Sequence, residues 1–96
     1  PAIELADPLC MLERLAASGT GLPGSRRPPA YLATVGTRDP LLDDTRRLGQ
    51  ALTKLGVENQ TRFYADEVHA FQALVFRQQA KQAWADTFTF LDQHLR

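Results

Sequence analysis

Two short β-favouring segments, separated by a helical segment, constrain the fold of this chain most strongly. The first, "AYLATVG" at 30–36, is a mostly apolar run bounded by proline and glycine, which predicts a strand buried on both faces. The second, "QTRFYA" at 60–65, predicts another strand. Because a helix lies between them, we expect the strands to run parallel with a right-handed crossover.

The crossover helix has a clear apolar stripe and clear end signals. Asp43 or Asp44 suits its N-cap, and Gly56 suits its end, directly after a last turn that carries Lys54. The residues of the stripe follow the i, i+3, i+4, i+7 spacing of one helix face: Leu48, Ala51, Leu52 and Leu55.

A helical pattern precedes the two strands and another follows them. The first helix is expected at 8–18, because Asp7 suits the N-cap and Gly19 suits the position after the last turn. The last helix is expected at about 77–95. Trp84 and Phe88, four residues apart, are expected to pack in the core. One side of the helix carries these residues: Ala80, Trp84, Thr87, Phe88, Leu91 and Leu95.

The resulting order, α-β-α-β-α, predicts a single partial domain of the α/β class over residues 1–96. Two parallel strands do not make a stable sheet, and three helices must cover both of its faces. An apolar face or edge would stay exposed. The Gly/Pro-rich segment at 19–29 fits either a linker or a surface loop. We therefore expect the last part of a larger α/β sheet; the start at Pro1 fits a fragment or removal of an initiator methionine.

Charge and cysteine content exclude several classes of function. Eleven basic residues balance eleven acidic ones, so there is no electrostatic argument for binding nucleic acid or an anionic membrane surface. The lone Cys10 rules out an intrachain disulfide and is expected to pack as a small apolar residue. No apolar run is long enough to span a membrane and no signal peptide is visible, which weakly favours a cytoplasmic location.

Asp39 and His69 are the candidate catalytic residues. Asp39 follows the first predicted strand by three residues, and His69 follows the second by four. Parallel neighbouring strands end at the same edge of a sheet, where the chemistry of open α/β sheets gathers, so the two side chains are expected within hydrogen-bond reach. A carboxylate on one ring nitrogen fixes the tautomer of a histidine and leaves the other nitrogen free as a base.

A structural interpretation of the same residues stays open. His69 can be a loop histidine that bonds to backbone, and Asp39 can close a turn before Pro40. Asp43 and Asp44 are competing carboxylates, but helix capping is sufficient to explain them. The pair also lacks a nucleophile.

The remaining aromatic residues and the second histidine are expected to be structural. Phe71 is expected under the loop that carries His69, with a role in a substrate pocket as the alternative. Tyr31 and Tyr64 are expected to pack on the strands, with partners for their hydroxyl groups. His94 lies in the last turn of the last helix, where a cation complements the helix dipole, and it is assigned no chemistry.

Taken in order, several stretches resemble the C-terminal end of the hormone-sensitive-lipase-like carboxylesterases, which have the α/β-hydrolase fold. Those stretches are "PPAYLATVGTRDPLLDD", "ALTKLGVENQTRFYADEVHAF" and the closing "FTFLDQHL". The resemblance implies that Asp39 is the acid and His69 the base of a Ser-His-Asp triad, with the serine upstream of this chain, since the order in that fold is Ser, Asp, His. Ala70 stands where the family usually has glycine, and the G-x-S-x-G elbow and the oxyanion loop are absent.

The predicted function is hydrolysis of a carboxylic ester, with this chain supplying the acid and base and being inactive alone. The resemblance implies no metal or organic cofactor, a small-molecule ester substrate, and a homodimer that forms through strand 60–65 and the last helix. Ser18 and Ser25 lie in loop or helix-end sequence and are not expected to act. Two alternatives remain: a non-catalytic module of the same fold that binds partners, and a stand-alone small α/β domain.

Overall fold

The computed structural model describes residues 7–19, 21 and 28–95. The predicted order of helices and strands is confirmed, and a short 3-10 helix, η1, was not predicted. Most of the segment predicted as a loop at 19–29, including Ser25, lies outside the described residues. The elements are α2 (Pro8–Ser18), β1 (Tyr31–Gly36), α3 (Leu42–Lys54), β2 (Asn59–Tyr64), η1 (Phe71–Ala73) and α4 (Gln78–His94).

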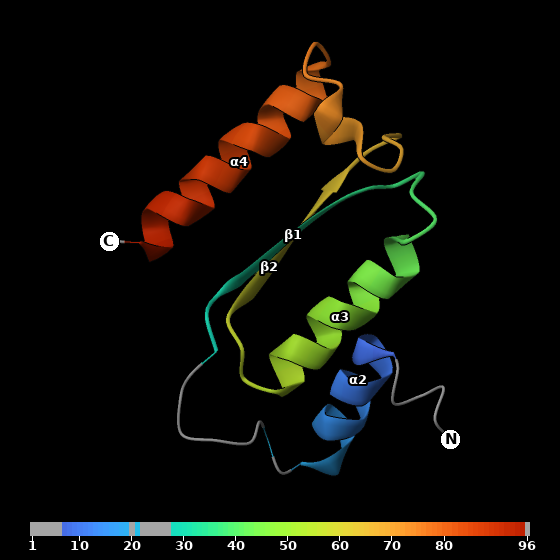
Figure 1. Cartoon of the computed structure of the whole chain (residues 1–96), viewed down its shortest axis with the longest axis vertical. Coiled ribbons are helices and arrows are strands. Elements are labelled where there is room, and N and C mark those ends of the chain that lie inside the picture. The colour runs from blue at the N-terminus through green and yellow to red at the C-terminus, as the bar shows by residue number, and fades with distance from the viewer. Residues whose placement is uncertain (1–6, 20, 22–27, 96) are drawn as a thin grey trace.

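The two strands form a parallel sheet between layers of helix. The register runs from Tyr31 opposite Asn59 to Gly36 opposite Tyr64. Helix α4 lies on one side of the strands and α3 on the other, with α2 packed outside α3 (Figure 1). Because both strands point the same way, the loops after β1 and β2 emerge together at one end of the sheet.

Helix α2 begins and ends as its sequence predicts. Oδ1 of Asp7 accepts hydrogen bonds from the backbone N–H groups of Leu9, at 3.0 Å, and Cys10, at 3.2 Å. The Cys10 N–H donor lowers the pKa of Asp7. The helix ends at Gly19, whose φ of 73° is left-handed.

Helix α3 begins earlier than its capping signals predict. Leu41 is its N-cap and makes no side-chain capping bond, so the prediction that Asp43 or Asp44 caps this helix is wrong. Both aspartates lie in the first turn, where Asp44 forms an ion pair with Arg47 at 3.0 Å. The chain turns at Asp39, before either aspartate, and the Asp39 carboxylate accepts a hydrogen bond from the N–H of Leu41. This turn sets the start of the helix.

A small core lies between the end of β2 and the start of α4. The Tyr64 and Phe71 rings lie 5.0 Å apart, and Ala80 and Ala83 of α4 complete the cluster. The Tyr64 hydroxyl donates to Asp86 at 2.5 Å, which lowers the pKa of Asp86, while burial raises the pKa of Tyr64. The predictions that Phe71 packs under the loop and that the Tyr64 hydroxyl finds a partner are confirmed.

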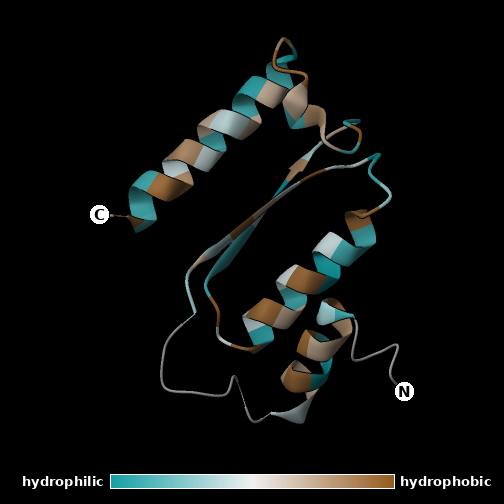
Figure 2. Cartoon of the chain, in the orientation of Figure 1, coloured by the Kyte–Doolittle hydropathy of each residue, from teal (hydrophilic) through white to brown (hydrophobic). Residues whose placement is uncertain are grey.

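The outer part of α4 and much of β1 are more exposed than predicted. Trp84 is 46% exposed and Phe88 63% exposed, so the prediction that both are core residues is wrong for the described chain. In β1 only Val35 and Gly36 are buried, so the prediction of a strand buried on both faces is also wrong. The physical reason is that two strands offer too little surface to cover a helix of this length. Hydrophobic residues therefore remain on the helical faces (Figure 2).

None of the described helices is long and apolar enough to cross a membrane.

Candidate active site

The loop after β1 holds Asp39 in a tight turn. The backbone N–H of Asp39 donates to Gly36 O at 3.1 Å, and the N–H of Leu42 donates to Asp39 O at 3.1 Å. Oδ1 of Asp39 accepts from the N–H of Leu41 at 2.8 Å. These bonds fix the carboxylate, whose side chain is 8% exposed, and leave Oδ2 to face the neighbouring loop.

The loop after β2 brings His69 onto that oxygen. Nδ1 of His69 lies 2.9 Å from Oδ2 of Asp39, so the expected contact is present. The histidine side chain is 63% exposed, and among the described residues Asp39 is its hydrogen-bond partner. Asp39 is therefore the carboxylate that meets the histidine, while Asp43 and Asp44 pair with arginines of α3.

The charge state of Asp39 determines which ring nitrogen of His69 is free. The N–H of Leu41, and after it His69, lower the pKa of Asp39 against the opposing effect of burial. The carboxylate is then ionised near neutral pH and can only accept hydrogen bonds, so Nδ1 of a neutral ring must carry the proton. Nε2 is left with a free lone pair on a side chain that is 63% exposed, which is the arrangement a general base requires.

Backbone contacts lock the two loops together. A Cβ atom at Gly36 would lie 2.1 Å from the carbonyl oxygen of Glu67, so only glycine lets the histidine loop cross the end of β1. The same carbonyl accepts from the N–H of Arg38 at 2.9 Å, and Thr37 Oγ1 accepts from the N–H of Asp66 at 2.7 Å. The roles of Gly36 and Glu67 were not predicted; their signals are a glycine at a strand end and an acid two residues before the histidine.

The described residues supply no activated nucleophile beside this pair. The Ser18 hydroxyl donates to Leu15 O at the end of α2, and Ser25 lies outside the described residues. The Asp7 carboxylate raises the pKa of the Cys10 thiol, which disfavours a thiolate. Within residues 7–19, 21 and 28–95, no group of three His, Cys, Asp or Glu side chains could hold a metal ion.

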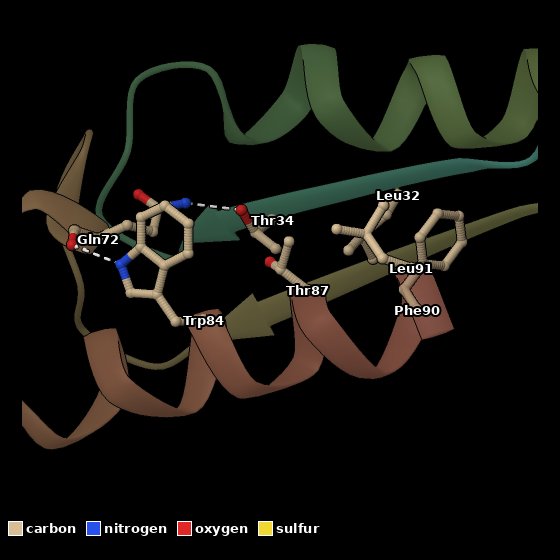
Figure 3. A pocket seen from close by; sticks show the side chains of 7 residues that line it. All are labelled: Leu32, Thr34, Gln72, Trp84, Thr87, Phe90 and Leu91. Atoms are coloured by element: carbon tan, nitrogen blue, oxygen red, sulfur yellow. Dashed lines mark hydrogen bonds between the residues drawn. The ribbon is translucent and has the colours of Figure 1, made fainter. Parts of the chain in front are cut away.

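An open pocket of about 450 Å³ lies between β1 and α4 (Figure 3). Gln72 links its walls: its side-chain Nε2 donates to Thr34 Oγ1 at 2.6 Å, and its backbone carbonyl oxygen accepts from Trp84 Nε1 at 3.1 Å. Neither Asp39 nor His69 lines this pocket. Phe71 is 1% exposed beneath the loop, which argues against the alternative that it contacts substrate.

His94 lies at the other end of α4 and has a structural partner. Its Nδ1 is 3.1 Å from Oε2 of Glu58, and its ring lies 4.4 Å from that of Phe90. The contact with Glu58 was not predicted, and it gives no reason to assign His94 chemistry.

A family model described as alpha/beta hydrolase fold matches residues 4–73, which is more than half of the chain. The chain belongs to this family, and its parallel strands and covering helices form a portion of an α/β-hydrolase sheet. Proteins of this family are in general hydrolases, so membership indicates hydrolase activity at that coarse level. Neither a search of curated proteins nor a search of solved structures gives a significant match.

Proposed function

We propose that the protein carrying this chain is a serine hydrolase of carboxylic esters, of the hormone-sensitive-lipase-like group. The observation that carries the proposal is the 2.9 Å contact between His69 Nδ1 and Asp39 Oδ2 at the carboxyl ends of two parallel strands. In α/β-hydrolases the serine precedes the acid and the base in sequence, which agrees with a serine upstream of Pro1. Residues 1–96 then form the last part of one catalytic domain and are inactive alone.

In the proposed reaction His69 carries out the proton transfers, and Asp39 orients its ring. Nε2 of His69 removes the proton from the serine hydroxyl as its oxygen attacks the ester carbonyl, and the Asp39 carboxylate stabilises the imidazolium that forms. The imidazolium gives this proton to the leaving alcohol, which leaves an acyl-serine. Water then attacks the acyl-serine with His69 again as base, and the acid is released. No metal or organic cofactor takes part in these steps.

Exposed apolar surface on α4 and the outer edge of β2 support two proposed partners: the rest of the same fold and a second copy in a homodimer. Trp84, Phe88 and Leu91 of α4 are all at least 40% exposed, as expected for residues that pack against a part of the fold outside the described chain. Strand β2 pairs only with β1 among the described residues, so its outer edge can pair with a second copy in a homodimer.

A non-catalytic binding module of the same fold is the second candidate. It is favoured by one observation: the sequence holds no G-x-S-x-G elbow. The sequence upstream of Pro1 separates the two candidates, because the esterase requires a serine elbow there and the binding module does not.

The experiment is turnover of a short p-nitrophenyl ester by the whole protein. His69→Ala should abolish turnover, because it removes the base. His94→Ala is the matched control, since it removes the other histidine, which pairs with Glu58 away from Asp39. Turnover that survives His69→Ala would refute the proposed role.

A further inference from the structure

The histidine loop carries a second acidic residue, Glu67, that the triad does not use. Its side chain is 2% exposed, although glutamate is rarely buried. Oε1 of Glu67 accepts from Nε and Nη2 of Arg77 at 3.2 and 2.8 Å, and from Nε2 of Gln79 at 3.1 Å. Oε2 is buried and has no partner among the described residues.

Stability alone does not explain a buried carboxylate at this position. Removing the Glu67 carboxylate from water costs free energy that its attraction to the partly exposed Arg77 must offset, and a well-packed apolar side chain is often as stabilising at a buried position. A buried oxygen without a donor adds a further cost. What the pair does provide is a directional, charged connection between the loop and the N-cap of α4.

The position of Glu67 shows what this connection holds. Its backbone lies across the end of β1, where its carbonyl oxygen accepts a hydrogen bond from the N–H of Arg38, the residue before Asp39. Its side chain is fastened to Arg77 and Gln79, and Gln79 also donates to Ala65 O at 2.8 Å. Glu67, two residues before His69, therefore holds the loop on two sides. Its backbone fixes the loop to the segment that carries Asp39, and its side chain fixes the loop to the start of α4.

We propose that Glu67 is a positioning residue, which through Arg77 holds the His69 loop so that Nδ1 stays against Asp39. Glu67 acts on His69 through the backbone of the loop and touches no reacting atom. The predicted effect of Glu67 on kcat rests on the proposed function. Its predicted effect on the tautomer of His69 does not require ester hydrolysis.

The kinetic test compares matched variants of the whole protein. Glu67→Gln should lower kcat by about 10²-fold with little change in KM, the loss expected when a reacting group is displaced by about 1 Å. Arg77→Lys keeps the charge and should retain most activity, whereas Arg77→Met should lose as much as Glu67→Gln. Glu13→Gln is the control, because it breaks another carboxylate–guanidinium pair between separate elements, with Arg47, at the α2–α3 contact.

The geometric test is a long-range ¹H–¹⁵N NMR spectrum of the whole protein at pH 8, with the His69 signals assigned by their loss in His69→Gln. The unmodified protein should show His69 with its proton on Nδ1, and Glu67→Gln and Arg77→Met should show a mixture of tautomers. An unchanged tautomer in these variants overturns the proposal, whatever happens to kcat. If Glu67→Gln does not fold, the comparison of Arg77→Lys with Arg77→Met tests the proposal instead. The Arg77 side chain is 44% exposed, so its replacement should not prevent folding. A protein without esterase activity refutes the proposed function, while the tautomer still decides the role of Glu67.

Discussion

The loops at the carboxyl ends of the strands differ sharply from the outer face of α4. In the loops, contacts within the chain fix the site: Asp39 meets His69 at 2.9 Å, and the Glu67 carbonyl closes over Gly36. On α4, Trp84 and Phe88 face an open pocket or solvent. The contact between Asp39 and His69 therefore depends on residues that this chain contains, whereas the described residues leave the apolar face of α4 largely uncovered.

The largest effect is expected in the loops. Asp39→Asn in the whole protein should lower kcat by about 10⁴-fold, because an amide can hold the wrong tautomer of the histidine. Asp43→Asn is the control: Asp43 is exposed and lies near Arg46, not His69. Steady-state hydrolysis of a p-nitrophenyl ester measures both variants, and a loss below tenfold in Asp39→Asn would show that the observed contact has no catalytic role.

The second-largest effect is expected on the apolar face of α4. If a further layer covers α4 in the whole protein, Phe88→Ala should lower its free energy of unfolding by about 3 kcal/mol, as for a buried phenylalanine. If Phe88 remains 63% exposed, as in the described chain, the change should stay within about 0.5 kcal/mol. Urea unfolding measures the difference, with the fully buried Phe71→Ala as the reference for a core position.

Gly36→Ala should destabilise the junction of the two loops. The added Cβ would lie 2.1 Å from the Glu67 carbonyl oxygen, so backbone must move, at a cost of about 1–3 kcal/mol in the free energy of unfolding. Gly49→Ala in α3 is the control, because its Cβ would meet a threonine hydroxyl at 3.1 Å and alanine favours the helix. Equal stability of the two variants in urea would show that the crossing at Gly36 is not tight.

The smallest effect concerns the core beneath the site. Tyr64→Phe should cost about 1 kcal/mol in the free energy of unfolding, because it removes the hydrogen bond to Asp86. The pKa of Asp86 is lowered in the folded state, so this contribution is present above the unfolded pKa of about 3.9 and is lost as the pH falls through the folded value. The difference in the free energy of unfolding between the unmodified protein and Tyr64→Phe should therefore become smaller at acid pH. Tyr31→Phe, at a residue that is 44% exposed, should show no such loss at any pH.

Local signals in the sequence were sufficient for the order of elements and for the central contact. The Asp7 cap and Gly19 define α2, and the β-α-β pattern implies parallel strands whose ends share one edge. That edge brings Asp39 to His69 without further information. The N-cap of α3 lies two or three residues before the predicted one, because a turn such as the one at Asp39 can begin a helix without a side-chain cap.

Two features could not be predicted, because they depend on the path of the loop and on neighbouring layers. The loop that carries Glu67 to Arg77 has left-handed backbone at Asp66, with φ 60°, and at Ala70, with φ 58°, and neither residue is a glycine that would signal it. The exposure of Trp84 and Phe88 depends on how much sheet lies beneath α4. A helical stripe indicates which side of a helix is apolar, but not how much protein covers it.

A crystal structure of the whole protein with an alkylphosphonate on its reactive serine would test the central claim most directly. We predict that Nε2 of His69 lies within about 2.6–3.2 Å of the modified serine oxygen, with Nδ1 still on Asp39. A phosphonylated serine that lies beside another base, or a protein that takes up no phosphonate, would contradict the assignment of this chain as the acid–base half of a serine hydrolase.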